Sequence, residues 1–256
     1  MDRHQQSEAI ILKADPVGEI HKSLALLSPS LGLIYAMAHG ARSAKGRLKG
    51  LSLPFMAGNF YLYLDPVRKS WKITDVAVGR MFEGVRGDLD KFYAASFMAE
   101  LVLKSYGGDP AAVHRLLLEA LAALEGGRPG SFREPLLRFI WRYLAIAGLQ
   151  PSTEHCAGCG LAFRAPVRGG IWYDPLGAGF VCGGCRGEHA AALPAGSLEY
   201  LETIPALGFE PGWRAEPDEK GLFALSMILF RLIETSLGIK SVVLENGKDI
   251  LKSKSQ

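Results

Sequence analysis

The stretch Cys156-Ala157-Gly158-Cys159 is matched downstream by Cys182-Gly183-Gly184-Cys185, and these two segments contain all four cysteines of the chain. Twenty-two residues separate the two C-x-x-C pairs. Each pair places two sulfur atoms on one side of a tight turn, and two such turns supply the four tetrahedral thiolate ligands of a structural zinc site. The sequence therefore predicts one structural Zn²⁺ per chain, held by Cys156, Cys159, Cys182 and Cys185.

Other roles for these cysteines fit less well. Two disulfides require an oxidising compartment, yet the chain begins Met1-Asp2-Arg3-His4 without a signal peptide. A redox C-x-x-C needs no second copy, and a catalytic zinc keeps one position open for water, which four thiolates do not leave. No H-x-E precedes a P-C-x-x-C, so a zinc deaminase is also disfavoured.

Composition describes a core-forming globular protein. The 256 residues are 48% hydrophobic and 21% charged. The longest apolar runs are interrupted by Arg, Lys or Glu, so no membrane span is expected. With reduced cysteines and no targeting segment, we expect a cytoplasmic protein.

The distribution of charge is more informative than the net charge of +3. From Lys22 to Leu64 the chain has no acidic residue but five basic ones, namely Lys22, Arg42, Lys45, Arg47 and Lys49. A basic segment without acids favours binding of a polyanion, although an ordinary solvated loop has the same composition.

Residues 1–80 have the pattern of a small β domain. Turn sequences such as Ser28-Pro29-Ser30 and Asp65-Pro66 separate short apolar runs. The candidate strands are 9–12, 22–28, 31–38, 51–55, 59–64 and 71–78. We expect a barrel of the oligonucleotide-binding (OB) type, although this pattern also fits another small β barrel or sandwich.

The remainder is predicted to be helical around a zinc ribbon, so the fold class is α+β with several domains. Asp88, Asp109 and a capping box at Ser131–Glu134 mark helix starts. Between the cysteine pairs, residues 171–173 and 179–181 suit a short hairpin. The predicted parts are a helical domain in two pieces (81–155 and 187–247), the zinc ribbon (156–186) and a basic flexible tail (248–256).

The basic loop is the best candidate for nucleic-acid binding. Arg42, Lys45, Arg47 and Lys49 would neutralise phosphates, with Lys22 on the neighbouring strand. Tyr35, Phe55, Tyr61 and Tyr63 are candidates for base stacking, although each is individually more typical of a core. The six histidines are scattered, and no P-loop, G-x-S-x-G or dinucleotide fingerprint occurs, so we expect no enzymatic activity.

Several segments, in their order and spacing, resemble the RecO family of recombination mediators. They are Glu8-Ala9-Ile10-Ile11-Leu12 with Gly18-Glu19, Gly32-Leu33, His39-Gly40-Ala41-Arg42-Ser43-Ala44-Lys45, Leu53-Pro54-Phe55, Phe132-Arg133-Glu134-Pro135-Leu136-Leu137 and Gly148-Leu149-Gln150-Pro151. The resemblance covers residues 8–237. Two departures are Pro29-Ser30-Leu31, where the family has an acidic residue before Gly32, and Pro135 within a helix.

The resemblance implies a DNA-binding mediator of recombinational repair at the nucleoid. Such proteins bind single- and double-stranded DNA, anneal complementary strands, pair with RecR, contact the acidic C-terminal tail of single-stranded-DNA-binding protein and help to load RecA. For that tail it implies a groove with Arg133 and Arg138 at its rim and Leu137 and Trp141 in its wall. The same arginines could equally serve to solvate the helix.

Two other functions share some of these features. A zinc-ribbon RNA-binding or transcription-associated module would have the same basic segment but should prefer RNA. A metal-dependent hydrolase would need an open zinc ligand, which the four-cysteine pattern does not provide.

Overall fold

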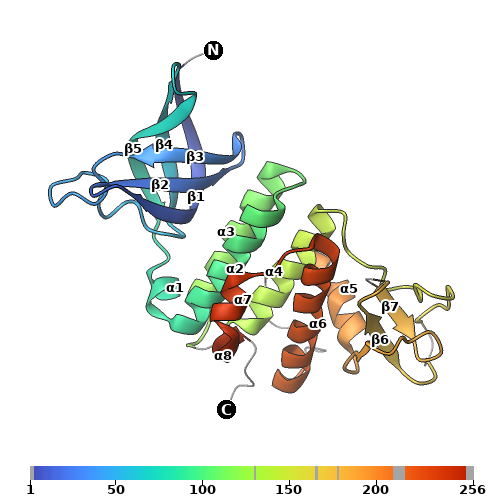
Figure 1. The fold of residues 1–256 in the computed structure, drawn as a ribbon. Helices are drawn as coiled ribbons and strands as arrows, with labels where there is room; N and C mark the ends of the chain where they lie inside the picture. The colour runs from blue at the N-terminus through green and yellow to red at the C-terminus, as the bar shows by residue number, and fades with distance from the viewer. Residues whose placement is uncertain (1–2, 130, 165–166, 178, 210–216, 252–256) are drawn as a thin grey trace. The chain divides into compact units, whose positions relative to one another are not determined.

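The computed structural model describes residues 3–129, 131–164, 167–177, 179–209 and 217–251, apart from the side chains of residues 248 and 249. The chain forms two compact units, Met1–Gly130 and Ser131–Gln256. The first contains a β barrel followed by helices, and the second contains helices and a small three-stranded sheet (Figure 1).

The barrel is closed by five strands in the order β1-β2-β3-β5-β4. Their bounds are β1 His4–Val17, β2 His21–Ser28, β3 Gly32–Ala38, β4 Ala57–Asp65 and β5 Ser70–Arg80. The β3–β5 pairing is parallel and the other four pairings are antiparallel. The predicted OB-type barrel is confirmed. Strand β1 pairs with β4 through His4–Ile10 and with β2 from Ile10 onward, with a shift in register between Ile11 and Lys13.

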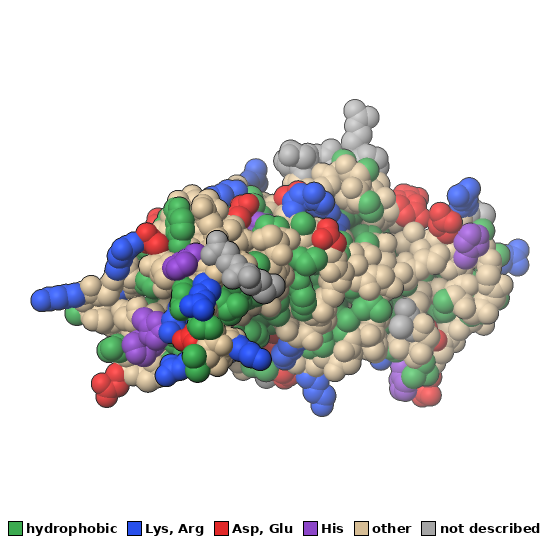
Figure 2. Space-filling view, turned by 90° about the horizontal axis from the view of Figure 1, so that it is seen from above, with side chains coloured by type: hydrophobic (Ala, Val, Ile, Leu, Met, Phe, Trp, Pro, Cys, Tyr) green, Lys and Arg blue, Asp and Glu red, His purple; other side chains and the backbone are tan. Residues whose placement is uncertain are grey.

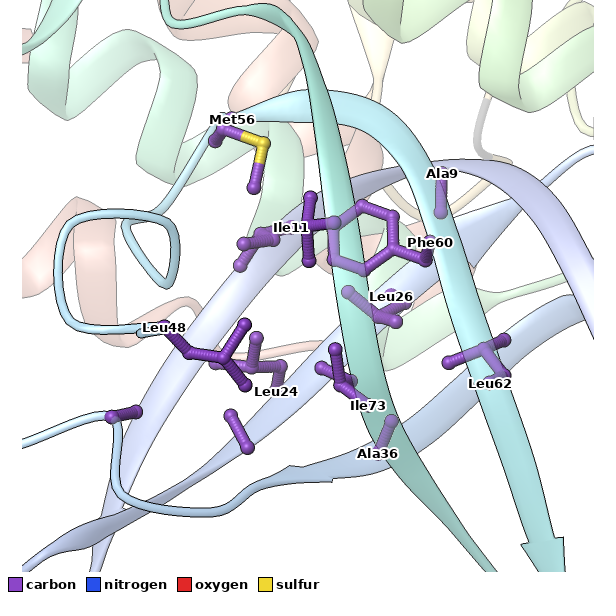
Figure 3. Packing of buried hydrophobic residues seen from close by; sticks show 13 residues of the cluster. Ala9, Ile11, Leu24, Leu26, Ala36, Leu48, Met56, Phe60, Leu62 and Ile73 are labelled. Atoms are coloured by element: carbon purple, nitrogen blue, oxygen red, sulfur yellow. The ribbon is translucent and has the colours of Figure 1, made fainter. Parts of the chain in front are cut away.

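Alternate residues of the strands fill the interior of the barrel, as the two-residue period of a strand requires (Figure 3). Phe60, at the centre of β4, is fully buried among Ile11, Leu26 and other side chains of the cluster. Three residues outside the strands belong to the same core, because Ala41, Leu48 and Met56 of the β3–β4 loop are buried in it.

The predicted strand at residues 51–55 is wrong. These residues form turns and coil, and Phe55 has a left-handed backbone with φ 69°. Instead of a ladder, this segment makes two hydrogen bonds to β1 where its register shifts: Phe55 N donates to Ile11 O and Ile11 N donates to Met56 O. The apolar run is partly buried without being a strand, which explains why its hydrophobic pattern was misassigned.

Three helices complete the first unit: α1 Glu83–Gly87, α2 Leu89–Ser105 and α3 Pro110–Gly126. The predicted caps are present, since Asp88 accepts from the N–H groups of Asp90 and Lys91, and Asp109 caps α3 in the same way. Helix α2 contacts β1, and α3 contacts β1, β2 and β3. These helices therefore pack with the barrel, whereas the sequence grouped them with the helices that follow residue 130.

The second unit contains the predicted zinc ribbon together with five helices of the described residues. The helices are α4 Arg133–Ile146, α5 Ser197–Leu207, α6 Glu219–Leu237, α7 Val242–Asn246 and α8 Lys248–Leu251, and the strands are β6 Ile171–Asp174, β7 Gly179–Cys182 and β8 Ala191–Ala192, in the order β7-β6-β8. The predicted hairpin is the β6–β7 pair. None of the described helices combines the length and the apolar content needed to cross a bilayer.

Two local predictions in this unit were wrong. Helix α4 begins after Phe132, whose side chain makes no capping hydrogen bond, so Ser131 is not its N-cap; Pro135 lies in the first turn, where proline is tolerated. The tail from residue 248 begins as helix α8, and Leu251 is fully buried. Residues 252–256 lie outside the described part of the chain.

Candidate nucleic-acid interface and metal centre

Strand pairing brings three basic segments together at one end of the barrel. Lys22, near the start of β2, is opposite Ala38, the last residue of β3. The parallel β3–β5 pairing then places Lys72 of β5 opposite Met37. The β4–β5 turn, which carries Arg68 and Lys69, directly precedes β5, and the charge of Arg68 acts on His39, the residue that follows β3.

Contacts and charge interactions link several of these groups. The His21 and His39 rings lie 4.8 Å apart, nearly perpendicular. Burial lowers the pKa of His39, and the charges of His21, Lys72 and Arg68 lower it further. Burial, and then the charge of Arg42, lowers the pKa of Lys22. We call His21, Lys22, His39, Arg42, Arg68 and Lys72 the basic barrel end. Figure 2 shows Lys, Arg and His side chains gathered over the barrel.

The four predicted basic residues of the loop are all exposed, but they are not equivalent. Arg42 donates from Nη1 to the carbonyl oxygen of Gly18 over 3.0 Å, which fixes it against the β1–β2 turn. Arg47 forms an ion pair with Asp75 of β5, which offsets part of its charge. Lys22 is half-buried and donates to the carbonyl oxygen of Ser52 over 2.9 Å, so its ammonium ties β2 to the loop.

The loop is a folded segment because its apolar residues are anchored. Ala41 and Leu48 enter the barrel core, and successive turns are closed by Ser43 N to Gly40 O and Gly46 N to Ser43 O, each 3.0 Å. The alternation of buried apolar and exposed basic residues directs the positive charges toward solvent.

The aromatic candidates divide into exposed and buried side chains. Tyr35 on β3 is 59% exposed and Tyr61 on β4 is 39% exposed, so both remain available to stack on bases. Phe55 is 2% exposed and its ring packs 5.6 Å from that of Phe92, so it is a core residue and the stacking prediction for it was wrong. Tyr63 lies between His4 and Lys72.

Sequence reasoning missed Arg68, Lys72 and the histidine pair as parts of this surface. The acid-free window ends at Leu64, and Asp65 follows it directly. Asp65 accepts from Lys72 Nζ over 2.7 Å, and this hydrogen bond is the main reason that the pKa of Asp65 falls to about 2. The sequence signal that could have revealed this part of the surface was the Arg68-Lys69 pair in a predicted turn. Placing that turn beside the β3–β4 loop required the order of the strands, which the sequence does not give.

The four cysteines form one cluster whose sulfur atoms all lie within 4.8 Å of one another. The first C-x-x-C turn is closed by Gly160 N donating to Cys156 O, and Gly160 has φ 73°. Gly158 is needed for space, because a Cβ there would lie 3.1 Å from the Sγ of Cys185. Four sulfur donors at this separation fit a single metal ion, so these residues could hold one.

Hydrogen bonding within the cluster shifts the pKa values of two thiols in opposite directions. Burial raises the pKa of Cys156, but N–H groups of Cys182, Cys159 and Gly158 outweigh it and lower the pKa to about 6. Hydrogen bonding with the thiols of Cys159, Cys182 and Cys156 raises the pKa of Cys185 to about 12. Four neighbouring sulfur atoms do not all ionise without a compensating positive charge, which a metal ion supplies.

The predicted peptide groove is not open. Arg133, Leu137, Arg138 and Trp141 are each at most 8% exposed. Arg138 forms an ion pair with Glu134 and donates to Tyr200 Oη and Gly208 O, both 3.4 Å away, while Arg133 donates to Leu251 O over 3.0 Å. These residues hold α4 against neighbouring segments of its own unit, and the prediction that they line a surface groove was wrong.

Comparison with known families assigns both parts of the chain. The family model described as "Recombination protein O N terminal" matches residues 1–80, and the one described as "Recombination protein O C terminal" matches residues 86–242. The chain belongs to the RecO family. The first match coincides with the barrel, and the second spans the helices and the cysteine cluster.

Relatives of similar length support this membership. A DNA repair protein RecO of Desulforudis audaxviator is 30% identical over 201 residues, covering 76% of each chain. Those of Rubrobacter xylanophilus and Anaeromyxobacter dehalogenans (strain 2CP-1) are 31% and 34% identical, covering 79% and 78% of this chain and 81% and 78% of the relatives. This RecO-family chain is a DNA repair protein with an OB-like barrel and a four-cysteine cluster able to hold a metal.

Proposed function

We propose that this RecO-family protein binds single- and double-stranded DNA through the basic barrel end and the adjoining β3–β4 loop, and anneals complementary strands. The observation that carries the proposal is that strand pairing brings basic groups from three separate segments to one end of the barrel. Exposed Tyr35 and Tyr61 add surfaces on which bases can stack.

Annealing on this surface requires no bond to be made or broken in the DNA. Two complementary strands repel each other through their phosphates, and cationic side chains that neutralise these phosphates lower the repulsion and release counterions. Base pairing then supplies the free energy. Because the contacts are to phosphates, the affinity should be independent of sequence and should fall steeply with salt.

In this proposal the protein acts at the nucleoid with the partners that its family membership implies. It pairs with RecR, contacts the acidic C-terminal tail of single-stranded-DNA-binding protein, and thereby helps RecA to load on DNA coated by that protein. Family membership supports these partners, and we assign no surface to the tail because the side chains predicted to line its groove are buried.

We propose Zn²⁺ as the ion of the cysteine cluster. Four thiolates favour zinc over magnesium or calcium, which prefer oxygen ligands, and a closed set of four ligands favours a structural role. Cys156 and Cys182 are buried while Cys159 is exposed, so the ion would tie a small apolar cluster to the ribbon surface.

The test is an annealing assay with complementary oligonucleotides, with and without bound single-stranded-DNA-binding protein. The double variant Arg42→Glu, Arg68→Glu should lose annealing and show a weaker salt dependence of DNA affinity, by about 0.7 in log–log slope for each single-strand phosphate contact removed. Arg115→Glu, an exposed charge reversal on α3, serves as the matched control and should behave as wild type. Undiminished annealing by the double variant would refute the assignment, and preference for RNA in competition would favour an RNA-binding module.

A further inference from the structure

The histidine pair at the barrel end has a chemistry that arginine and lysine lack, since histidine changes its charge near neutral pH. His21 is the first residue of β2, and His39 directly follows β3. The backbone N–H of Gly40 donates to Nδ1 of His21 over 3.1 Å. In this hydrogen bond Nδ1 is the acceptor, so the ring nitrogen of His21 that can donate to another group is Nε2.

His39 has no such restraint and faces a field of positive charge. From β2 it faces His21, from the β4–β5 turn Arg68, and from β5 Lys72. Lys22 of β2 and Arg42 of the same loop as His39 are a second pair of neighbouring positive charges. The only acid that the described contacts bring to these groups is Asp65, which is already paired with Lys72. Burial of part of the ring and these like charges therefore lower the pKa of His39 and favour its neutral form in the free protein.

We propose that His39 is a proton-coupled contact to the DNA backbone: a phosphodiester bound at the basic barrel end draws one proton onto its imidazole, while His21, whose Nδ1 accepts from Gly40, donates to the phosphate through Nε2–H. This inference rests on the proposed DNA-binding function. A phosphate anion reverses the local field, so the protonated form of His39, disfavoured in the free protein, becomes favoured in the complex.

The sign of the pH effect follows by linkage. A group whose pKa is higher in the complex than in the free protein takes up a proton on binding, so DNA affinity rises as pH falls through that interval. Each unit by which DNA raises the pKa corresponds to a tenfold gain in affinity between the two limits. With one histidine responding, the slope of log affinity against pH should reach at most about one.

The experiment measures the affinity of the full-length protein for a rhodamine-labelled oligo(dT) by anisotropy, at constant ionic strength, from about pH 8 to about pH 5.5, which brackets the ordinary histidine pKa of about 6.5. Wild type is expected to bind about five- to tenfold more tightly at the acidic end. His39→Gln should lose this gain, so that its affinity changes little between the two pH limits. His189→Gln, an exposed histidine of the second unit, is the matched control and should retain the full gain.

His21→Gln separates the two roles, because it should weaken binding similarly at every pH while His39 continues to titrate. A proton NMR titration of the His39 Cε1–H provides an independent measurement, and its pKa should rise when oligo(dT) is added. The inference is overturned if wild type binds DNA at pH 8 without any gain on acidification, or if His39→Gln keeps the wild-type slope. Failure of wild type to bind DNA at any pH would refute the proposed function as well.

Discussion

Gly46 offers a direct test of whether the β3–β4 loop is a folded segment that positions its basic side chains. A Cβ added at Gly46 would lie 1.9 Å from the carbonyl oxygen of Gly40. That neighbour is backbone and no rotamer change relieves the overlap, so the loop must move by more than 1 Å to restore a contact of 3.0 Å. Gly50, in the same loop, has no atom within 4 Å of the position that an added methyl group would take and no positive φ, so Gly50→Ala is the matched control.

The two substitutions should change the free energy of unfolding in opposite directions. Forcing an extra methyl group into a packed site costs about 1–3 kcal/mol. Replacing an unstrained glycine by alanine stabilises by about 0.4–1 kcal/mol, because the unfolded chain loses conformational freedom. The variants should therefore differ by about 1.4–4 kcal/mol, or about 0.7–2 M in urea midpoint at an m-value of about 2 kcal/mol/M.

The assay must report on the barrel alone, because the chain has two compact units. Trp71 is the only tryptophan before residue 130. Its resonance in fluorotryptophan-labelled protein, followed by fluorine NMR through a urea titration, isolates that unit. The displaced loop of Gly46→Ala should also weaken DNA binding with no change in net charge. Equal midpoints for the two variants would show that the loop is not fixed by its backbone contacts, and would refute the reasoning.

Three further outcomes are expected. Cys156→Ala should lose the one metal ion bound per chain, as measured by elemental analysis, and the ribbon should unfold while DNA binding by the barrel persists. The reason is that apparent zinc binding contributes about 10–16 kcal/mol to folding in comparable modules. A retained metal ion would contradict the assignment of Cys156 as a ligand. Arg138→Leu should destabilise the second unit by about 2–3 kcal/mol in urea unfolding, because charge-assisted hydrogen bonds to Tyr200 and Glu134 are lost. A variant as stable as wild type would argue against a packing role for Arg138. Lys72→Met should raise the pKa of Asp65 from about 2 toward 3.8, as measured by carboxyl NMR. Because this pKa is depressed in the folded protein, the stabilisation that ionised Asp65 contributes is present above about pH 4 and is lost as pH falls toward 2. An unchanged pKa of Asp65 in the variant would show that Lys72 is not the cause of the shift.

Local signals in the sequence were sufficient for the elements they determine. A carboxylate before a helix binds N–H groups two and three residues ahead, so Asp88 and Asp109 marked the starts of α2 and α3 correctly. The spacing of the cysteine pairs likewise predicted the cluster, because each C-x-x-C turn forms within four residues. The strand order was not local, but the number of short strands pointed to the right class of barrel.

The errors arose where partners lie far apart in the chain. Arg138 was predicted to lie at a surface, but its partners Tyr200 and Gly208 follow 62 and 70 residues later and enclose it. A helix pattern cannot reveal such partners, and the buried guanidinium is possible only because they are present. The basic barrel end depends similarly on the pairing of β3 with β5, which no short-range signal encodes.

The course of β1 makes closure of the barrel depend on the beginning of the chain. Residues His4–Ile10 cover the edge of β4, and β1 then continues along β2. A protein lacking these residues would expose the hydrogen-bonding groups of β4 as a free edge, open to pairing with another chain. Truncation at this end should therefore cause self-association before any loss of the cysteine cluster, so an expression tag belongs at the other terminus.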